Sequence, residues 1–370
     1  MRKLRVGVIF GGRSGEHEVS LMSAQSVIQA IDRQKYEVVP IGITRDGRWI
    51  ASGDPMRALL EGRPGLSAPA AVLPQPGAGL RLTDGGSSGR ESGDAAIDVF
   101  FPVLHGPYGE DGTIQGLLEL AGAPYVGSGV AASAAGMDKA MMKALFQQAG
   151  LPVVPYVVVV EPEWRRDAAA VRARLEAEIG YPCFVKPANM GSSVGVSRVT
   201  SGEGLGPALE RALRYDRKVL VEQEASCCRE VEVGVLGNDD PEASVPGEVV
   251  PAGDFYDYRA KYLDDRSELI IPARIGPKAR AAVRDIALRA FRAIDGAGLA
   301  RVDFFVHKET ERVWVNEINT MPGFTRMSMF PKLWEASGLP YDQLIDRLIQ
   351  LALERHGQRA RLETRPEPAG

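Results

Sequence analysis

Cysteine and histidine are scarce in this chain of 370 residues. It contains three cysteines, of which Cys227 and Cys228 are adjacent, and four histidines. Three cysteines are too few for a disulfide-stabilised scaffold, so we expect free thiols in a reducing compartment. So few imidazole and thiol groups also argue against a zinc site built from histidine and cysteine.

The chain also lacks a marked excess of either charge and any long apolar run. The 44 Lys and Arg residues oppose 48 Asp and Glu residues, which gives a net charge of −4. A nucleic-acid-binding surface should be basic, so we expect no nucleic-acid partner. No stretch approaches the ~20 apolar residues of a membrane span, and the apolar run 6–10 is too short for a signal peptide. We therefore expect a cytoplasmic protein with no membrane partner.

The N-terminal pattern is typical of an open α/β sheet. Residues 5–10 predict a strand, a glycine-rich turn follows, a helix begins near Glu16, and residues 37–43 predict a second strand. A later strand at 97–103 leads to His105. Because ligands bind at the carboxyl ends of the strands in such sheets, these positions are candidate site positions.

The segment 62–93 differs from its surroundings. Of its 32 residues, eight are Gly, four are Pro and four are Ser, a composition that predicts a flexible surface insertion. Beyond it we expect strands and helices in alternation. The strands are predicted at 153–160, 183–186, 220–222 and 230–236, and the helices around Lys139 and Lys143, at 277–295 and at 341–354.

Two strand-like runs near the C-terminus, 301–306 and 313–319, are joined by a short polar turn and predict a β-hairpin. Alternation along the second strand puts Glu317 and Asn319 on one face. Pairing about the turn brings Asp303 opposite or next to Glu317, with Cβ atoms about 5 Å apart. Two carboxylates and an amide are hard oxygen ligands of the kind that Mg²⁺ prefers.

The alternative is a surface hairpin whose acidic residues merely face water. The opposite face of the hairpin is strongly apolar, which would anchor the sheet and present the acidic face, so we favour the metal site. The residues of the predicted apolar face are Val302, Phe304, Val306, Trp314 and Ile318.

A second feature is a strand ending in Lys186, followed by a loop of small residues up to Val196. Backbone N–H groups in such a loop can bind phosphate, and the lysine adds positive charge. The loop matches neither the P-loop nor the dinucleotide fingerprint, and taken alone it would favour a plain β-turn, because loops of Gly and Ser are common. Combined with a Mg²⁺ site it indicates a nucleotide. A third stretch, 255–262, has three tyrosines, a lysine and an arginine, and predicts either a loop that closes over an anion or an exposed polar loop.

Five motifs, in order along the chain, resemble those of the D-alanine–D-alanine ligases of the ATP-grasp superfamily. They are 11–20 (GGRSGEHEVS), 105–113 (HGPYGEDGT), 186–196, 256–262 and 316–323 (NEINTMPG). The resemblance covers the chain from about residue 5 to residue 350 and implies a three-domain ATP-grasp fold that begins with the open α/β domain. The expected domains are 1–127, 128–223 and 224–358, followed by a tail at 359–370. ATP would be held between the second and the third of these domains.

The resemblance also implies the nucleotide and metal ligands. Two Mg²⁺ (or Mn²⁺) ions would be ligated by Asp303, Glu317 and Asn319. The ATP phosphates would contact Lys139, Lys186 and the loop residues Gly191, Ser192, Ser193 and Val194, and adenine and ribose would contact Glu222 and Glu230.

For the substrates, the resemblance implies that Glu16 holds the ammonium group of the first D-alanine. Ser192 and Tyr262 would be linked by hydrogen bonds, and His105 would contact substrate. Arg301 and the Gly323 backbone would stabilise the tetrahedral intermediate. Ser328 and Lys261 would hold the carboxylate of the second D-alanine.

The implied activity is the ligation of two D-alanines through a D-alanyl phosphate, with release of ADP and phosphate, for peptidoglycan precursors, by a homodimer. A D-alanine–D-lactate ligase is the nearest alternative. The depsipeptide-forming members of the family that we considered carry Phe at the position of Tyr262, so Tyr262 favours the peptide product. An inactive ATP-binding module would not need the complete residue set. A dehydrogenase is disfavoured because no acidic residue closes a second strand at the distance that the dinucleotide fingerprint requires.

Overall fold

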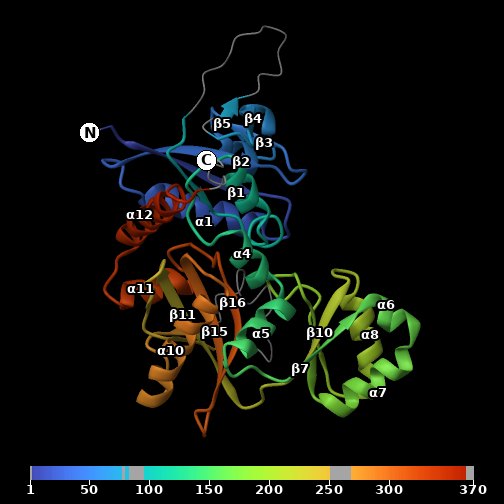
Figure 1. The fold of residues 1–370 in the computed structure, drawn as a ribbon. Helices are drawn as coiled ribbons and strands as arrows, with labels where there is room; N and C mark the ends of the chain where they lie inside the picture. Colours follow the sequence, from blue (N-terminus) through green and yellow to red (C-terminus); the bar gives the residue numbers. More distant parts are fainter. Residues whose placement is uncertain (1, 77–79, 83–95, 251–267, 364–370) are drawn as a thin grey trace, which may run out of the picture.

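The computed structural model describes residues 2–76, 80–82, 96–250 and 268–363. Within these ranges the chain forms three β-sheets with helices packed on their faces, so the expected α/β class is confirmed. Figure 1 shows the N-terminal sheet above, the C-terminal sheet below it, and the central sheet beside the C-terminal one. Among the described helices, none has the length and apolar character needed to cross a membrane.

The N-terminal sheet has the strand order β5-β4-β3-β2-β1-β6. Its strands are β1 (Leu4–Gly11), β2 (Tyr36–Ile43), β3 (Trp49–Ala51), β4 (Ala68–Val72), β5 (Leu80–Leu82) and β6 (Val99–Pro102). The central strand β1 runs parallel to β2 and β6 and is buried on both sides. Helices α1 (His17–Ala30) and α12 (Tyr341–Arg359) cover one face, and α3 (Thr113–Leu120) covers the other. Coverage on both faces explains why β1 is a continuous apolar run.

The described part of the segment 62–93 contains a 3₁₀ helix and two strands, none of which the sequence analysis predicted. After α2 (Pro55–Leu60), a 3₁₀ helix (Pro64–Leu66) leads into β4, which pairs antiparallel with β3 and β5. Ala70 and Val72 are buried in this sheet. Small apolar residues at alternate positions can extend an existing sheet, although composition alone suggests a linker. Residues 77–79 and 83–93 lie outside the described residues.

The central sheet is antiparallel, in the order β7-β10-β8-β9. Its strands are β7 (Tyr156–Val160), β8 (Cys183–Pro187), β9 (Ser197–Val199) and β10 (Lys218–Gln223), and its helices are α6 (Glu161–Arg166), α7 (Ala168–Glu178) and α8 (Gly202–Ala212). Val185 and Val221 pack under these helices. Because side chains alternate along a strand, their neighbours Lys186 and Glu222 project from the opposite face.

The C-terminal sheet has the order β14-β13-β11-β15-β16, with β12 paired to β11. Its strands are β11 (Cys228–Gly237), β12 (Glu242–Ala243), β13 (Gly247–Val250), β14 (Glu268–Ile270), β15 (Gly298–His307) and β16 (Val313–Asn319). One face packs against α10 (Pro277–Ala293), α4 (Val130–Met137) and α5 (Lys139–Gln148), while α11 (Met329–Ala336) contacts β11. The other face of β11, β15 and β16 therefore remains available for polar side chains.

A buried ion cluster ties β13 to its surroundings. The Glu248 carboxylate lies 2.8 Å from the Arg229 guanidinium of β11 and 2.9 Å from that of Arg274, which precedes α10. Burial acts to raise the pKa of Glu248, but hydrogen bonds from Arg274 and Arg229 outweigh it and lower this pKa to about 2. The carboxylate is therefore ionised at neutral pH.

The predicted hairpin is confirmed in β15 and β16, where Asp303 pairs with Glu317 and Arg301 with Asn319. A β-bulge lies between this pair and the next, since Phe304 pairs with Val315 and leaves one extra residue on β16. The bulge reverses the alternation of β16, so that Val315 enters the core while Glu317 faces the polar side.

This bulge also corrects the assignment of Trp314 to the apolar face. Trp314 pairs with Phe305 on the polar side of the hairpin and is only partly buried. The Arg312 guanidinium lies over its ring, 4.7 Å from the centroid. A bulge cannot be recognised from a strict period of two, which is why the prediction failed.

The hydrophobic cores divide the chain differently from the expected domain ranges. Leu344 and Leu348 of α12 pack into the core of the N-terminal sheet, although the segment was assigned to 224–358. Met142 and Phe146 of α5 pack on the C-terminal sheet, although they lie within 128–223. A boundary drawn along the sequence cannot represent an element that crosses back to another sheet. Figure 1 shows α12 beside α1 and α5 beside β16.

Candidate active site

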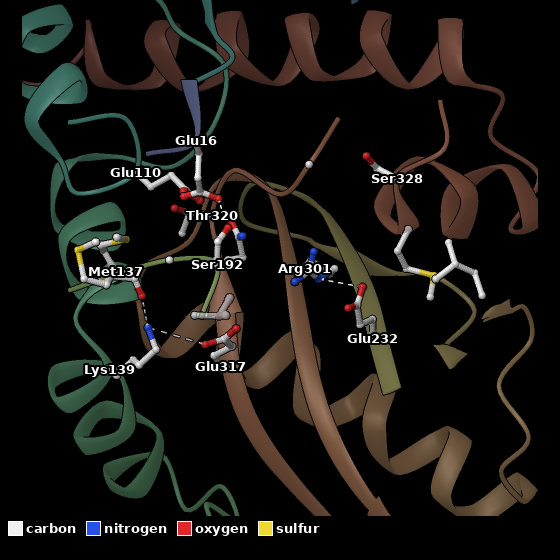
Figure 2. A pocket seen from close by; sticks show the side chains of 18 of the residues that line it. Glu16, Glu110, Met137, Lys139, Ser192, Glu232, Arg301, Glu317, Thr320 and Ser328 are labelled. Atoms are coloured by element: carbon white, nitrogen blue, oxygen red, sulfur yellow. Dashed lines mark hydrogen bonds and ion pairs between the residues drawn. The ribbon is translucent and has the colours of Figure 1, made fainter. Parts of the chain in front are cut away.

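Two adjoining cavities lie where the sheets meet. The first, of about 140 Å³, is lined by Glu16 from the N-terminal part, Ser192 from the central loop, and Arg301 and Ser328 from the C-terminal part (Figure 2). The second, of about 250 Å³, lies between the central and C-terminal sheets and is lined by residues including Lys186. Both cavities are lined by Lys139, Met190, Gly191, Ser192, Glu232 and Glu317, so they form one continuous site.

Glu16 lies at the N-terminal end of α1 and is buried, and its backbone N–H donates to Ser14 Oγ. Its side chain does not cap the helix, and instead its Oε1 accepts a hydrogen bond from Ser192 Oγ. The structure thus brings together two predicted site residues that are 176 positions apart in the chain. The loop after Lys186 lies closed against the N-terminal domain through this contact.

Two glycines let the backbone approach the Glu16 carboxylate. A Cβ atom on Gly106, which has a φ of +74°, would lie 2.6 Å from Glu16 Oε2, and one on Gly191 would lie 2.8 Å from the same atom. Both distances are shorter than real Cβ contacts. The loops 105–113 and 187–196 therefore both require glycine where they contact Glu16.

Glu110 is a lining residue of the first cavity that the sequence analysis did not single out, although it lies within the motif 105–113. It is buried, and its Oε2 accepts a hydrogen bond from the Gly106 N–H. Burial raises the pKa of Glu110 well above its ordinary value, and the nearby Glu16 charge raises it further. This carboxyl is thereby favoured in its protonated form beside the Glu16 carboxylate.

His105 is buried, and both of its ring nitrogens have protein partners. Nδ1 lies 3.0 Å from the Met321 carbonyl oxygen and Nε2 lies 3.1 Å from Ser23 Oγ. A carbonyl oxygen can only accept, so Nδ1 carries a proton. Burial lowers the pKa of His105, against the opposing effect of the Glu16 charge. The ring lines a third cavity, within the N-terminal domain, next to Tyr108 and Arg13.

Lys139 begins α5 and lies at the junction of the two main cavities. Its Nζ donates to the Met190 carbonyl oxygen at 2.7 Å and lies 4.0 Å from Glu317 Oε2. Figure 2 shows the Lys139 side chain directed toward Glu317. Asp138 caps the helix by accepting from the Ala140 N–H, which fixes the start of α5 and hence the direction of the lysine. Lys139 therefore links the small-residue loop to the β15–β16 hairpin.

Glu222 lies between two lysines on the inner face of the central sheet. Its Oε1 lies 2.5 Å from Lys143 Nζ, and its Oε2 accepts a hydrogen bond from Lys186 Nζ. The side chain of Glu222 is almost completely buried. Its carboxylate is thus committed to two ion pairs, although the residue lines the second cavity as expected for a nucleotide contact.

The loop and the far end of the second cavity contain the other predicted nucleotide ligands. Ser193 and Glu230 line this cavity. Val194 closes the turn of the loop through its N–H, which donates to the Gly191 carbonyl oxygen at 3.1 Å. Ser192 and Ser193 have positive φ values of 49° and 58°. The chain turns sharply here and presents its backbone to the cavity.

Three neighbouring strands align acidic residues across the polar face of the C-terminal sheet. Glu232 of β11 pairs with Asp303 of β15, which pairs with Glu317 of β16. Arg301 lies two residues before Asp303 on the same face of β15, and its Nε is 3.0 Å from Glu232 Oε2 and 2.7 Å from Asp303 Oδ1. Sequence analysis missed Glu232. Its alternation with Glu230 along β11 was the available signal.

The donor set fits a hard divalent cation. Asp303 and Glu317 supply carboxylates at directly paired positions, and Asn319, two residues from Glu317, supplies an amide oxygen. In the described part of the chain, no cluster of three His, Cys, Asp or Glu side chains is placed to hold a metal ion. A site of this kind leaves positions for phosphate oxygens and water, as Mg²⁺ requires.

The loop after β16 completes the first cavity. Gly323 and Ser328 both line it, and Ser328 Oγ lies 2.8 Å from Thr325 Oγ1. A Cβ on Gly323 would lie 3.2 Å from Ser328 Oγ, so this backbone also approaches closely. Lys261 and Tyr262, two predicted substrate residues, lie outside the described residues.

The fold and site define an ATP-grasp protein: an antiparallel sheet bearing lysines faces a second sheet bearing carboxylates across a nucleotide-sized cavity. Family models described as "D-ala D-ala ligase N-terminus" and "D-ala D-ala ligase C-terminus" match residues 5–128 and 145–350. The chain therefore belongs to the D-alanine–D-alanine ligase family, as its motifs suggested.

Individual relatives agree over the whole length of the chain. A D-alanine–D-alanine ligase of Heliobacterium modesticaldum is 51% identical and covers 100% of both chains, and one of Geobacillus thermodenitrificans is 52% identical, covering 96% of this chain and 97% of its own. Among solved structures, the D-alanine–D-alanine ligase of Coxiella burnetii matches with a TM-score of 0.84 and 35% identity over 97% of each chain. The VanG D-Ala:D-Ser ligase of Enterococcus faecalis matches with a TM-score of 0.82 and 34% identity, covering 95% of this chain and 100% of that one.

Proposed function

We propose that the protein joins two D-alanine molecules into D-alanyl-D-alanine, converts ATP to ADP and phosphate, and so supplies a precursor of peptidoglycan. The observation that carries the proposal is the pair of adjoining cavities, the first lined by Glu16 and Arg301 and the second by Lys186, with Lys139 and Glu317 lining both. Relatives named D-alanine–D-alanine ligase that span the full chain at about 50% identity support it.

The first step makes one carboxylate reactive. An amine does not attack a carboxylate at a useful rate, so a carboxylate oxygen must first take the γ-phosphoryl group of ATP and become a good leaving group. Lys139 and Lys186 would bind the phosphates, and the backbone of the loop 191–194 would enclose them. Glu222 and Glu230 line the part of the cavity left for adenine and ribose.

Two Mg²⁺ ions, or Mn²⁺ in their place, would be held by Asp303, Glu317 and Asn319, and when bound would neutralise negative charge on the transferring phosphoryl group. Arg301 shares Asp303 with this site, because its Nη2 lies 2.6 Å from Asp303 Oδ2. A change at either residue would therefore affect the other.

In the second step, the amine of the second D-alanine attacks the acyl phosphate, and the carbonyl oxygen becomes an oxyanion. Arg301 and the backbone N–H of Gly323 would stabilise this charge, because they can donate toward the centre of the first cavity. Glu16 would hold the ammonium group of the first D-alanine, and Ser192 would fix the Glu16 carboxylate through its hydrogen bond. His105 would support the loop 105–113 behind these two residues. Ser328 and Lys261 would bind the carboxylate of the second D-alanine.

Acyl phosphates hydrolyse readily, so water must be excluded while the intermediate exists. The hydrogen bond from Ser192 to Glu16 closes the small-residue loop over the first cavity and would serve this purpose. We expect the enzyme to act in the cytoplasm, where ATP is available, and as a homodimer, which light scattering of the purified protein would test.

The deciding experiment is mass spectrometry of the products formed from ATP, Mg²⁺, D-alanine, D-serine and D-lactate offered together at neutral pH. We expect D-alanyl-D-alanine as the main product, with one ADP and one phosphate per peptide bond. A predominant ester with D-lactate, or a predominant D-alanyl-D-serine, would assign a different second substrate. No product from an enzyme that still binds ATP would overturn the proposal.

A further inference from the structure

Lys143 is a buried charged residue that none of the steps above uses. It lies in α5, one helical turn after Lys139, and its side chain is 1% exposed. Residues four apart lie on the same face of a helix, so Lys139 reaches the cavity junction while Lys143 points behind it. The Lys143 ammonium lies 2.5 Å from Glu222 Oε1 and 5.8 Å from the centroid of the Tyr156 ring.

The charges around Glu222 explain what a lysine could do at this position. Lys143, Glu222 and Lys186 form a buried chain of two ammonium groups and one carboxylate, with a net charge of +1. Without Lys143, the Glu222 charge would be balanced by Lys186 alone. The cluster would then have a net charge of zero, so it would not attract a polyphosphate bound in the second cavity.

The ionisation of Glu222 agrees with this arrangement. Burial acts to raise the pKa of Glu222, but the Lys143 and Lys186 ammonium groups outweigh it and hold this pKa below its ordinary value. Burial likewise acts to lower the pKa of Lys186, and Glu222 raises it overall. Burial lowers the pKa of Lys143, and Glu222 opposes this effect. Lys143 Nζ and Glu222 Oε1 are within ion-pair distance of each other.

We propose that Lys143 is a positioning residue for the nucleotide, which balances the charge of Glu222 and so leaves the positive charge of Lys186 available to the ATP phosphates. The inference rests on the proposed use of ATP and adds a residue that does not contact the nucleotide itself. Its effect should therefore depend on the phosphates of the ligand and not on the adenine.

The test compares Lys143→Met with the double variant Lys143→Met/Glu222→Gln. Methionine is close to lysine in length and keeps the site filled, and the cluster then has a net charge of zero. The double variant removes one positive and one negative charge together, so the cluster returns to a net charge of +1, carried by Lys186. Lys35→Met, at an exposed lysine paired with Asp346 far from the site, is the matched control.

Binding of ATP and of adenosine would be measured by calorimetry, alongside the thermal unfolding of each variant. We expect Lys143→Met to weaken ATP binding by at least about tenfold, since one unit charge is lost at a partly buried site, and to leave adenosine binding unchanged. Because Glu222 itself lines the second cavity, the double variant is judged by the ratio of its ATP affinity to its adenosine affinity. This ratio should return to within about threefold of the native ratio, because the cluster charge is restored.

Native ATP affinity in Lys143→Met would overturn the proposal, and so would a double variant whose ratio of ATP to adenosine affinity is as low as that of the single variant. If Lys143→Met does not fold, the double variant decides alone, because the proposal requires this ratio to be close to the native one. Failure of the proposed ligase activity is distinguishable, because it appears as absent peptide product in native enzyme that binds ATP.

Discussion

Gly191 gives a test of whether the position of the Glu16 carboxylate determines D-alanine binding. In Gly191→Ala the new Cβ would lie 2.8 Å from Glu16 Oε2, whereas ordinary contact begins at 3.4 Å. The carboxylate oxygen must therefore move by about 0.6 Å, the difference of these two distances. A misplacement of about 1 Å in an active site can lower the rate about 100-fold, so we expect about a tenfold loss of kcat/KM for D-alanine.

Stability should respond differently from activity. The clashing atom is the end of a flexible side chain, and Gly191 needs no left-handed backbone, so Gly191→Ala should keep its Tm. Gly106→Ala combines the same kind of clash with a φ of +74°, and should lose both activity and about 1–2 kcal/mol of stability. Gly62→Ala, with a φ of +64° and no atom within 4 Å of the new Cβ, should lose stability alone.

The assay is steady-state kinetics with D-alanine varied at saturating ATP, together with thermal unfolding of all three variants. The test depends on activity and stability responding differently in the three variants, and less on the size of each change. A Gly191→Ala enzyme with native kcat/KM would refute the reasoning, because it would mean that Glu16 does not need its observed position. A loss of Tm as large as that of Gly106→Ala would refute it too, since the clash would then disturb the fold.

Three further predictions concern other parts of the molecule. Glu232→Gln replaces a carboxylate partner of Arg301 with a neutral amide, so we expect kcat to fall by about tenfold with an unchanged KM for ATP. Steady-state kinetics would check this, and an unchanged kcat would contradict the prediction. Because the pKa of Glu248 is lowered to about 2, its ionised form contributes about 3 kcal/mol of stability above pH 4.5, which is lost as the pH falls toward 2. In urea unfolding, the difference between native protein and Glu248→Gln should therefore narrow by about 1 kcal/mol between pH 7 and pH 3.5, and a constant difference would contradict the assignment. Iodoacetamide should modify the exposed Cys227 in the folded protein and spare Cys183, because Cys183 is buried and burial raises its pKa to about 11. Mass spectrometry of the peptides would check this, and modification of Cys183 would contradict the prediction.

Most of the strands and helices could be predicted because local periodicity determines them. The strand at 5–10 appears as β1, the helix at 277–295 as α10, and the pairing of Asp303 with Glu317 as expected from the hairpin turn. These features depend on residues close together in the sequence, where alternation and turn length leave little freedom. The prediction failed at the segment 62–93, because its short strands exist only where a neighbouring sheet accepts them.

The parts of the site that sequence analysis missed share one physical cause. Glu232 matters because β11 pairs with β15, and Lys143 because α5 packs beneath a strand of another sheet that carries Glu222. Each is one half of a long-range ion pair, and neither half contains a local pattern that identifies the other. Conversely, the motif residues could be named from the sequence because a resemblance transfers positions without requiring any knowledge of the contacts. What the structure adds is the set of charges around those positions, and these charges decide how much of the positive charge of Lys186 and Arg301 is left for a substrate.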